Sequence, residues 1–396
     1  MSNTFKMPEK KAVIFWPVGT GDSSTLVVKP GKTIMQIDLR HLEKAENPEE
    51  PEWPIIDHLV KSLPRREGKP YLSVFVLTHP DKDHIQGFEE LLTKVTIGEL
   101  WHTPKIFRAR NDQEALSKDA KAFRKEVNRR REAILKNPSN IKSGDRIRII
   151  GYDDILADDK YKELPPDCKS HPGELVTVLD GENLESDFHA FIHAPFKDDQ
   201  EKDKNSTSLS LNICLKQATQ FANFIFFGDR AYDTILRIFD TTENSNPSNK
   251  KHLEWDVMLS AHHCSKAAMY VREEGKEDYV LKQDIMDYFE KYARKNSGFI
   301  VSSSHSNFTS DSGDNPPHSK ARMQYSKIVS AGHFVCTHEF PTKVSPEPIV
   351  FTVDEKGLSF LDKREKSTSL SSIKEGVVAA RGRAEPPKTQ TTFGLD

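Results

Sequence analysis

Residues 71–88, YLSVFVLTHPDKDHIQGF, contain a short apolar run that is followed at once by a dense group of potential metal ligands. The run at 74–77, Val-Phe-Val-Leu, is typical of a buried strand, and the polar residues after it predict a loop at the carboxyl end of that strand. His79, Asp81, Asp83 and His84 then fall within six positions. On an extended chain alternate residues point to the same side, so the first three of these can share one side of the loop.

This group of donors indicates a site for more than one metal ion. Protein-bound zinc is usually four-coordinate, and two ions that share a loop account better for so many imidazoles and carboxylates in one place. The ordinary alternative is that the histidines are surface residues and that the carboxylates cap turns. The buried strand before the motif and the helix expected after it favour the metal site.

Composition limits the class of protein without deciding its function. The chain has 396 residues, enough for one large domain or two ordinary ones. Its 57 Lys and Arg and 60 Asp and Glu give a net charge of −3, so any basic binding surface has to be local. Four widely spaced cysteines without a C-x-x-C pair argue against a disulfide framework. No signal core and no run of 18 apolar residues is apparent, so we predict a soluble, cytoplasmic protein without membrane association.

The order of apolar segments predicts a β-rich, two-layer α/β core with long insertions rather than an alternating βαβ chain. We expect a helix at 55–63 and strands at 12–16, 24–29, 33–38, 74–77, 146–151, 175–179, 188–193, 208–215, 223–227, 255–260 and 298–303. Residues 363–396, rich in Ser, Thr and Lys, predict a flexible tail after a domain of residues 1–362. No glycine-rich nucleotide loop occurs, which excludes nucleotide-dependent dehydrogenases and ATPases.

A basic helical insertion is expected at residues 104–142. Between 105 and 136 the chain has eleven Lys or Arg against five Asp or Glu, a surplus of six positive charges in a chain that is acidic overall. Such a segment suits contact with nucleic acid or with a protein partner. A solvated helical face is the common alternative, and composition does not separate the two.

Three later segments repeat the pattern of an apolar strand with metal-competent residues at its carboxyl end. They end at Gly228-Asp229, at Ala261-His262-His263 and, most weakly, at His305. Loops at the ends of core strands can converge while the sheet holds them rigidly. We therefore expect Asp229 to bridge two cations and His262 to complete the ligands of the second one.

Taken together, these motifs resemble the metallo-β-lactamase fold in its ComEC-like branch. HPDKDHIQG at 79–87 closely matches that branch's H-P-D-x-D-H-I-G-G. Further motifs of the branch are similar to segments spread over most of residues 11–340: VGTGDSS at 18–24, the strand at 33–38, NSTSLSL at 205–211, Gly228-Asp229, AHHCSK at 261–266, Asn307 and Pro317-His318.

The resemblance implies an αββα sandwich with a dinuclear metal site at one edge of its two sheets. It also implies a hydrolase and, for this branch, a nuclease or phosphodiesterase. One ion would be bound by His79, Asp81 and Asp229, and the other by Asp83, His84, Asp229 and His262. Three histidines and three aspartates suit Zn²⁺ or Mn²⁺.

Some residues depart from the pattern of the family. A histidine usually stands where this chain has Asp81, and the usual third-motif histidine has no certain counterpart, although His193 lies near its place. Cys264 replaces a glycine, so it can narrow the pocket, contact a metal or pack. The chain has no counterpart of the membrane segments of ComEC, so a role in DNA uptake is not implied.

The expected reaction is hydrolysis of a phosphodiester by a metal-bound hydroxide, with Asp83 among the catalytic residues. His263 is a candidate general acid or phosphate ligand, although a histidine held by a carboxylate beside the metals is an equal alternative. Asp38 is expected to orient ligand histidines rather than to bind metal. Candidate phosphate contacts are Lys266, Ser265, Asn307 and, more weakly, His318.

Three functions remain open from the sequence. The first is a metal-dependent nuclease or phosphodiesterase with nucleic acid as its substrate. The second is a hydrolase of a small ester, lactone, thioester or cyclic nucleotide, because a fold does not determine its substrate. The third is a non-catalytic, partner-binding component of a multi-protein system that uses the segment 104–142.

Overall fold

The structure is a computed structural model that describes residues 5–42, 53–108, 116–199, 205–273, 275, 278–294, 298–308, 311 and 313–364. The chain divides after Asp362, and residues Met1–Asp362 form one compact unit. Of the tail expected at 363–396, residues 365–396 lie outside the described part of the chain. Among the described residues, no helix combines the length and the apolar character needed to cross a membrane.

The first sheet joins the amino-terminal strands to the last two strands of the unit. Its order is β23-β22-β1-β2-β3-β5-β6-β7-β8, and β4 pairs with β5. The strands are β1 (Lys11–Phe15), β2 (Ser24–Lys29), β3 (Thr33–Ile37), β4 (Arg65–Arg66), β5 (Lys69–Val76), β6 (Thr96–His102), β7 (Arg146–Ile150), β8 (Lys169–Ser170), β22 (Ile349–Asp354) and β23 (Gly357–Phe360). Along β3-β5-β6-β7-β8 each strand is parallel to its neighbour, whereas β4 is antiparallel to β5.

The second sheet has the order β19-β18-β15-β14-β13-β12-β9. Its strands are β9 (Leu175–Val176), β12 (Phe188–Ala194), β13 (Ser210–Gln217), β14 (Gln220–Phe226), β15 (Val257–Leu259), β18 (Phe299–Ser302) and β19 (Phe334–Cys336). Strands β14, β15, β18 and β19 are parallel, and the rest of the sheet is antiparallel. Each sheet is therefore half antiparallel and half parallel.

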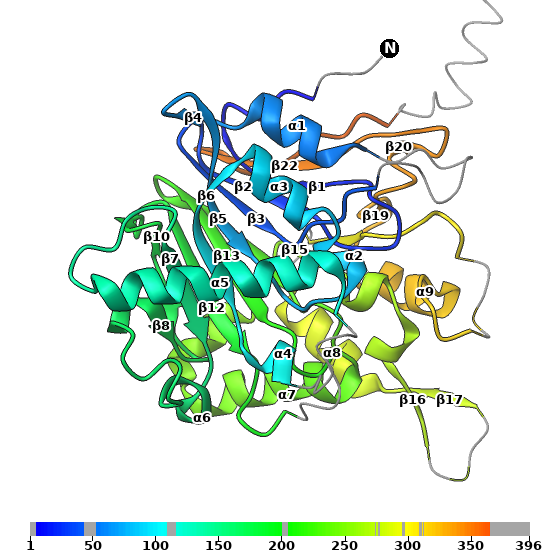
Figure 1. The fold of residues 1–396 in the computed structure, drawn as a ribbon. Helices are drawn as coiled ribbons and strands as arrows, with labels where there is room; N and C mark the ends of the chain where they lie inside the picture. Colours follow the sequence, from blue (N-terminus) through cyan, green and yellow to red (C-terminus); the bar gives the residue numbers. More distant parts are fainter. Residues whose placement is uncertain are drawn as a thin grey trace, which may run out of the picture. The chain divides into compact units, whose positions relative to one another are not determined.

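The parallel halves correct one expectation from the sequence, which predicted no alternating βαβ order. Helices connect successive parallel strands in both sheets (Figure 1). In the first sheet they are α1 (Ile55–Ser62), α2 (Lys82–Ile85), α3 (Phe88–Lys94), α4 (Lys105–Arg108), α5 (Lys118–Lys136) and α6 (Asp153–Leu156); in the second they are α7 (Tyr232–Ser245), α8 (Gln283–Tyr292) and α9 (Ser319–Ile328). Helix α1 was expected from the sequence, but α5, with eight Lys or Arg among its residues, resembles a polar insertion.

Three apolar clusters show how the layers are stacked. The cluster between the sheets contains residues of both, such as Val13, Val74, Phe224 and Val257. A second cluster joins the outer face of the first sheet to its helices, for example through Phe75, Phe88 and Phe123. The third joins the second sheet to α7, α8 and α9 through residues such as Ile235, Phe289 and Tyr325. Helices thus cover both outer faces of a pair of sheets, which confirms the αββα sandwich.

The expected insertion at 104–142 contains α4 and α5, and its residues 109–115 lie outside the described part. The buried Phe123 and Val127 of α5 belong to the cluster that covers the first sheet. Helix α5 is therefore part of the helical layer rather than an arm added to it.

Candidate metal centre

The loop after β5 positions His79 and His84 at the carboxyl end of the parallel strands. Leu77 still pairs with β6, donating its N–H to the carbonyl of Trp101 at 3.0 Å. The chain then turns, and Asp81 precedes the short helix α2, on which Asp83 and His84 are consecutive. His79 and His84 are fully buried, whereas the Asp83 side chain keeps 33% of its surface exposed.

Asp38, directly after β3, holds His84 from behind. Its φ of 53° lies in the left-handed region, which costs a non-glycine residue about 1–2 kcal/mol. The carboxylate accepts hydrogen bonds from the backbone N–H and the hydroxyl of Thr78, at 2.8 and 2.5 Å, and lies 2.7 Å from His84 Nδ1. A carboxylate in this place fixes the orientation of an imidazole and leaves Nε2 to bind elsewhere. Asp38 thus has the position that the sequence predicted for it.

Both histidines after β15 lie on a strained turn. His262, His263 and Cys264 have φ values of 49°, 52° and 66°, all in the region that L residues normally avoid. The His262 N–H donates to the carbonyl of Gly228 at 3.1 Å, which ties this turn to the one that carries Asp229. The two imidazole planes meet at 73°, with ring centroids 6.0 Å apart. His262 and His263 therefore point their rings in different directions although they are adjacent in the chain. Backbone strain of this kind is often found at functional sites.

Cys264 itself packs. It is fully buried in the apolar cluster on the outer side of the second sheet. Burial also raises the pKa of its thiol, so the sulfur stays protonated at neutral pH.

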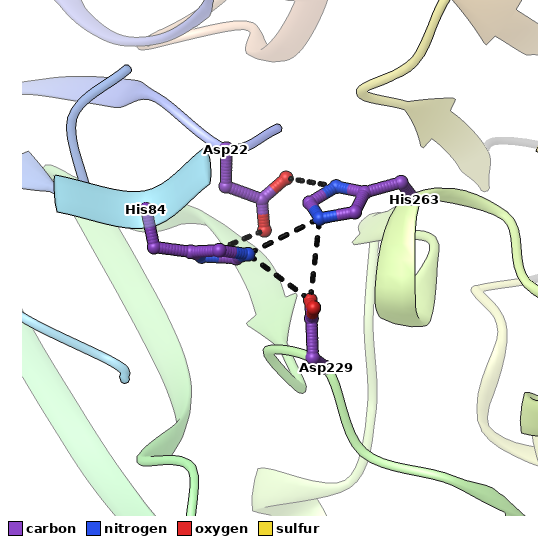
Figure 2. A group of neighbouring side chains, drawn as sticks. All are labelled: Asp22, His84, Asp229 and His263. Carbon is purple, nitrogen blue, oxygen red and sulfur yellow. Dashed lines mark hydrogen bonds and ion pairs between the residues drawn. The ribbon is translucent and has the colours of Figure 1, made fainter. Parts of the chain in front are cut away.

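Asp229 lies at the centre of the cluster, after β14. Its Oδ1 is 3.1 Å from His84 Nε2 and 3.4 Å from His263 Nε2 (Figure 2). Its Oδ2 is 3.4 Å from His79 Nε2 and 3.5 Å from His262 Nε2. Each oxygen of one carboxylate therefore faces a different pair of imidazoles.

His263 is enclosed by carboxylates on both sides of its ring. Its Nε2 lies 3.3 Å from Asp83 Oδ2 and 3.1 Å from His84 Nε2. On the other side, its Nδ1 lies 3.2 Å from Asp22 Oδ1 (Figure 2). The ring is only 1% exposed, so it has no open approach for a substrate.

Asp22 is the residue of the site that the sequence analysis did not select. The Asp22 N–H donates to the carbonyl of Asp83 at 3.0 Å, which brings the β1–β2 loop against α2. Gly21 permits this approach, because a Cβ there would lie 2.3 Å from Arg40 Cδ and 2.7 Å from the Asp83 carbonyl oxygen. The signal was present in the VGTGD segment, but one aspartate in a glycine-rich turn is too common to select without a structure.

The electrostatics of the site favour bound cations. Burial opposes ionisation of Asp83 and Asp229, yet the surrounding histidines hold the pKa of both carboxyl groups below the usual range. Burial likewise opposes charge on His84 and His263, yet the neighbouring carboxylates, Asp229 first among them, raise the pKa of both imidazoles well above 6.5. The carboxylates thus remain negative at neutral pH and hold protons on the imidazoles, which metal ions would displace.

The donor set fits divalent metal ions. Within the described part of the chain, His79 Nε2 and Asp229 Oδ1 are buried and have no hydrogen-bond partner. Two ligands at 2.0–2.1 Å from one tetrahedral ion lie about 3.3–3.4 Å apart. Six distances connect the carboxylate oxygens of Asp83 and Asp229 and the Nε2 atoms of the four histidines. They run from 3.1 to 3.5 Å, close to the spacing expected of two ligands of one ion.

Two further residues are Asp81, an expected ligand, and His193, which was considered but not selected. Among the described residues, the ligand atoms of Asp22, His84, Asp229 and His263 lie close together, and so do those of His79, Asp83 and His84. Asp81, half-buried beside α2, belongs to neither group, and nor does His262. His193, considered as a third-motif histidine, points toward α7, with Nδ1 3.1 Å from the Thr242 hydroxyl and Nε2 3.1 Å from the His252 carbonyl.

The candidate phosphate contacts have partners elsewhere in the protein. The Lys266 ammonium donates to the carbonyls of Asp311 and Gly313, at 2.7 and 2.8 Å. Ser265 caps the following helical turn by accepting from the Ala267 N–H at 3.2 Å. His318 is fully buried rather than on the surface, and its ring nitrogens face the Lys266 N–H and the Gly313 carbonyl. Asn307 is exposed.

No protein-family model matches the chain, and no curated protein matches it. Among solved structures, it is similar to the metallo-β-lactamase fold protein YhfI from Bacillus subtilis, with 10% identity, a TM-score of 0.39 and coverage of 86% of this chain and 99% of that one. It is also similar to a diphosphatase from the PhnP family, with 10% identity, a TM-score of 0.36 and coverage of 85% and 97%. The Rm3 metallo-β-lactamase follows, with 14% identity, a TM-score of 0.30 and coverage of 64% and 80%. Likenesses this distant say nothing about the activity of this chain.

Proposed function

We propose that the protein is a dinuclear metal-dependent hydrolase that cleaves phosphodiester bonds in nucleic acid. The observation that carries this proposal is the division of the Asp229 carboxylate between two pairs of imidazoles. A carboxylate whose two oxygens each face a separate pair of imidazoles is well placed to bridge two cations. The mixture of imidazoles and carboxylates suits Zn²⁺ or Mn²⁺.

The distances favour a division of ligands that differs from the one predicted from the sequence. The first ion would be held by His79, His262 and Asp229 Oδ2, with Asp81 as the remaining candidate beside them. The second would be held by Asp83, His84, His263 and Asp229 Oδ1. In this division His262 would be a ligand of the first ion, in a chain where the third-motif histidine has no certain counterpart, and His263 would be a ligand rather than a general acid.

Two carboxylates would hold the imidazoles of the second ion in place. Asp38 lies against His84 Nδ1 and Asp22 against His263 Nδ1, which in each ring leaves Nε2 directed at Asp229. Such partners fix the tautomer and raise the basicity of a ligand histidine. Both contacts are buried, so the rings would be held before a metal arrives.

A phosphodiester suits this arrangement. Two divalent cations would polarise the phosphoryl group and acidify the attacking water. The protein would contribute the two ionised carboxylates Asp83 and Asp229, fixed imidazole orientations and a buried setting in which electrostatic stabilisation is strong. A smaller ester remains the alternative substrate, and a non-catalytic role the alternative function.

The test is metal content together with cleavage. Purified protein is analysed for Zn and Mn and incubated with labelled single- and double-stranded DNA and RNA and with bis(p-nitrophenyl) phosphate, in the presence of Zn²⁺, Mn²⁺ or EDTA. We expect about two ions per chain and chelator-sensitive cleavage that Asp83→Ala abolishes. His171→Gln, which changes a histidine with 42% of its side chain exposed, serves as the control. Two bound ions without hydrolysis of any of these substrates would refute the catalytic assignment.

A further inference from the structure

We propose that the outward face of α5 holds the phosphate backbone of a nucleic-acid strand beside the metal centre. This inference deepens the proposed function and rests on it. The carrying residues are Lys121, Arg124, Lys125 and Asn128, which form one stripe on the helix and are called the α5 face below. Residues at these spacings lie on the same side of an α-helix.

The helix is fixed firmly enough to present that face in one orientation. Its opposite side buries Phe123 and Val127 against the first sheet. Arg130 is also buried and donates to the carbonyls of Ile97, Gly98 and Arg146 at 2.9 to 3.1 Å. Ser117 caps the first turn by accepting from the Ala120 N–H at 3.1 Å. The α5 face is therefore directed away from the sheet.

Among the described residues, few carboxylates neutralise the positive charge of this face. Helix α5 carries eight Lys or Arg and three Asp or Glu. Of its three acidic residues, Asp119 accepts the N–H of Glu89, and Glu126 pairs with Arg129 and Arg130. Glu132 lines the same groove in the surface as Lys121 and Lys125. Lys121 and Lys125 have no carboxylate partner in the described part of the chain, and the Arg124 guanidinium lies over the ring of Phe107, 5.9 Å from its centroid.

The same residues line a hollow in the surface. A groove of about 490 Å³ is bounded by Leu116, Lys121, Arg124, Lys125, Asn128, Arg129 and Glu132. Lys121 and Lys125 lie about 6 Å apart along the helix axis, given a rise of 1.5 Å per residue. A groove lined by cationic side chains and an amide suits a chain of phosphates better than an apolar partner. Phosphate contacts supply most of the sequence-independent affinity of proteins for nucleic acid.

The position of the helix connects this face to the proposed chemistry. The amino-terminal end of α5 is joined to the start of α3 by the hydrogen bond between Glu89 and Asp119, at 2.9 Å. Helix α5 also packs against α2, which carries Asp83 and His84 (Figure 1). A strand held on the α5 face would therefore lie next to the helix that supplies two of the proposed metal ligands.

The test measures binding without cleavage. Full-length protein in EDTA is titrated against fluorescent 20-nucleotide single- and double-stranded DNA and RNA by anisotropy, at several salt concentrations. The variant is Lys121→Glu with Lys125→Glu. The matched control is Lys61→Glu with Lys356→Glu, because it changes the net charge equally at exposed lysines on α1 and on the β22–β23 turn. Thermal unfolding of each variant checks that it is folded.

The α5 variant should bind on the order of tenfold or more weakly, and its log–log salt dependence should be shallower by about two, because two phosphate contacts are lost. The control should bind as the wild type does. Wild-type affinity and salt dependence in the α5 variant would overturn the inference. Competition by polyglutamate as effective as competition by unlabelled oligonucleotide would also overturn it, in favour of an acidic protein partner.

The two proposals can fail separately. Hydrolysis of bis(p-nitrophenyl) phosphate by the wild type tests the metal centre without the α5 face. Chelator-sensitive hydrolysis combined with undisturbed binding in the α5 variant refutes only the role of α5. Weakened binding in that variant, in a protein without any hydrolysis, supports the surface and refutes the proposed activity.

Discussion

Two groups of buried histidines in this molecule have opposite surroundings. His84 and His263 lie among carboxylates that raise the pKa of their imidazoles well above 6.5. His102 and His193 are as deeply buried, and burial lowers the pKa of each to about 3. Among the described residues, the ring nitrogens of His193 face a hydroxyl and a carbonyl. Burial alone thus makes a histidine neutral and structural, whereas burial among carboxylates creates a place for positive charge. The predictions below test that difference.

The largest effect is expected at the shared carboxylate. Asp229→Asn keeps the shape of the side chain but removes the negative charge that both pairs of imidazoles face. The metal ions are expected to stabilise the transition state by several kcal/mol. Losing that stabilisation would lower the rate of phosphodiester hydrolysis about 10³-fold. Metal analysis and steady-state kinetics check this, with His171→Gln as control. Wild-type metal content and rate in Asp229→Asn would refute the central role of the residue.

The division of the imidazoles between the two ions comes next. His84→Ala with His263→Ala should leave about one ion per chain, as His84→Ala alone does, because both rings belong to the second ion. His84→Ala with His262→Ala should leave almost none. Two substitutions at ligands of the same ion cause losses of bound metal that do not add up. Two substitutions at ligands of different ions cause losses that do. About one ion per chain in His84→Ala with His262→Ala, found by native mass spectrometry or metal analysis, would restore the division predicted from the sequence, in which His84 and His262 share an ion.

A smaller effect is expected from the carboxylates behind the rings. Asp22→Asn should lower the affinity for one of the two ions about 10- to 100-fold, as observed when carboxylates that support ligand histidines are changed. Competition with a chromogenic chelator measures this affinity. Thermal unfolding of the metal-free variant is the control, because a purely structural role of Asp22 would lower stability and leave metal affinity unchanged.

The smallest effect concerns the neutral group. The pKa of His193 is about 3 in the folded protein and about 6.5 in an unfolded chain, so the unfolded state binds more protons between these values. The neutral His193 therefore contributes fully to the free energy of unfolding above pH 6.5. This contribution falls as the pH drops toward 3, by about 1.4 kcal/mol per pH unit at most.

Urea unfolding of metal-free protein at pH 7 and pH 5.5 measures this contribution. His193→Gln should be less stable than the wild type at pH 7 and closer to it at pH 5.5. The exposed His171→Gln should show no such convergence. An equal difference at both pH values would mean that His193 does not titrate as its surroundings indicate.

Much of the fold could be predicted from the sequence because its strands are strongly apolar. The αββα sandwich is confirmed, and most expected strands occur within a few residues of their predicted bounds. The parallel halves of the sheets were missed, since the connecting helices expose charged faces and α5 in particular has a basic composition. The ComEC-like branch, the nuclease activity and the cytoplasmic location stay predictions.

The candidate site could be predicted where several potential ligands lie close together in the sequence. It could not be predicted where a potential ligand stands alone. His79, Asp83 and His84 lie within six positions, and Asp229 and His262 follow apolar strands, so pattern alone could select them. Asp22 could not be selected, because its role depends on a loop folding back onto α2. Lys266 and His318 contact backbone carbonyls in the folded chain, which no local pattern shows, and their role toward a substrate stays a prediction.

The sequence by itself determined the layers and the residue types of the site, because apolar periodicity and donor chemistry are local properties. Tertiary structure alone decided which imidazole faces which oxygen of Asp229. That choice depends on the left-handed turn at His262 and His263 and on the meeting of two sheets, and no local pattern encodes either. Burial then separated the histidines among carboxylates from those among neutral groups, because the pKa of an imidazole follows the charges that surround it.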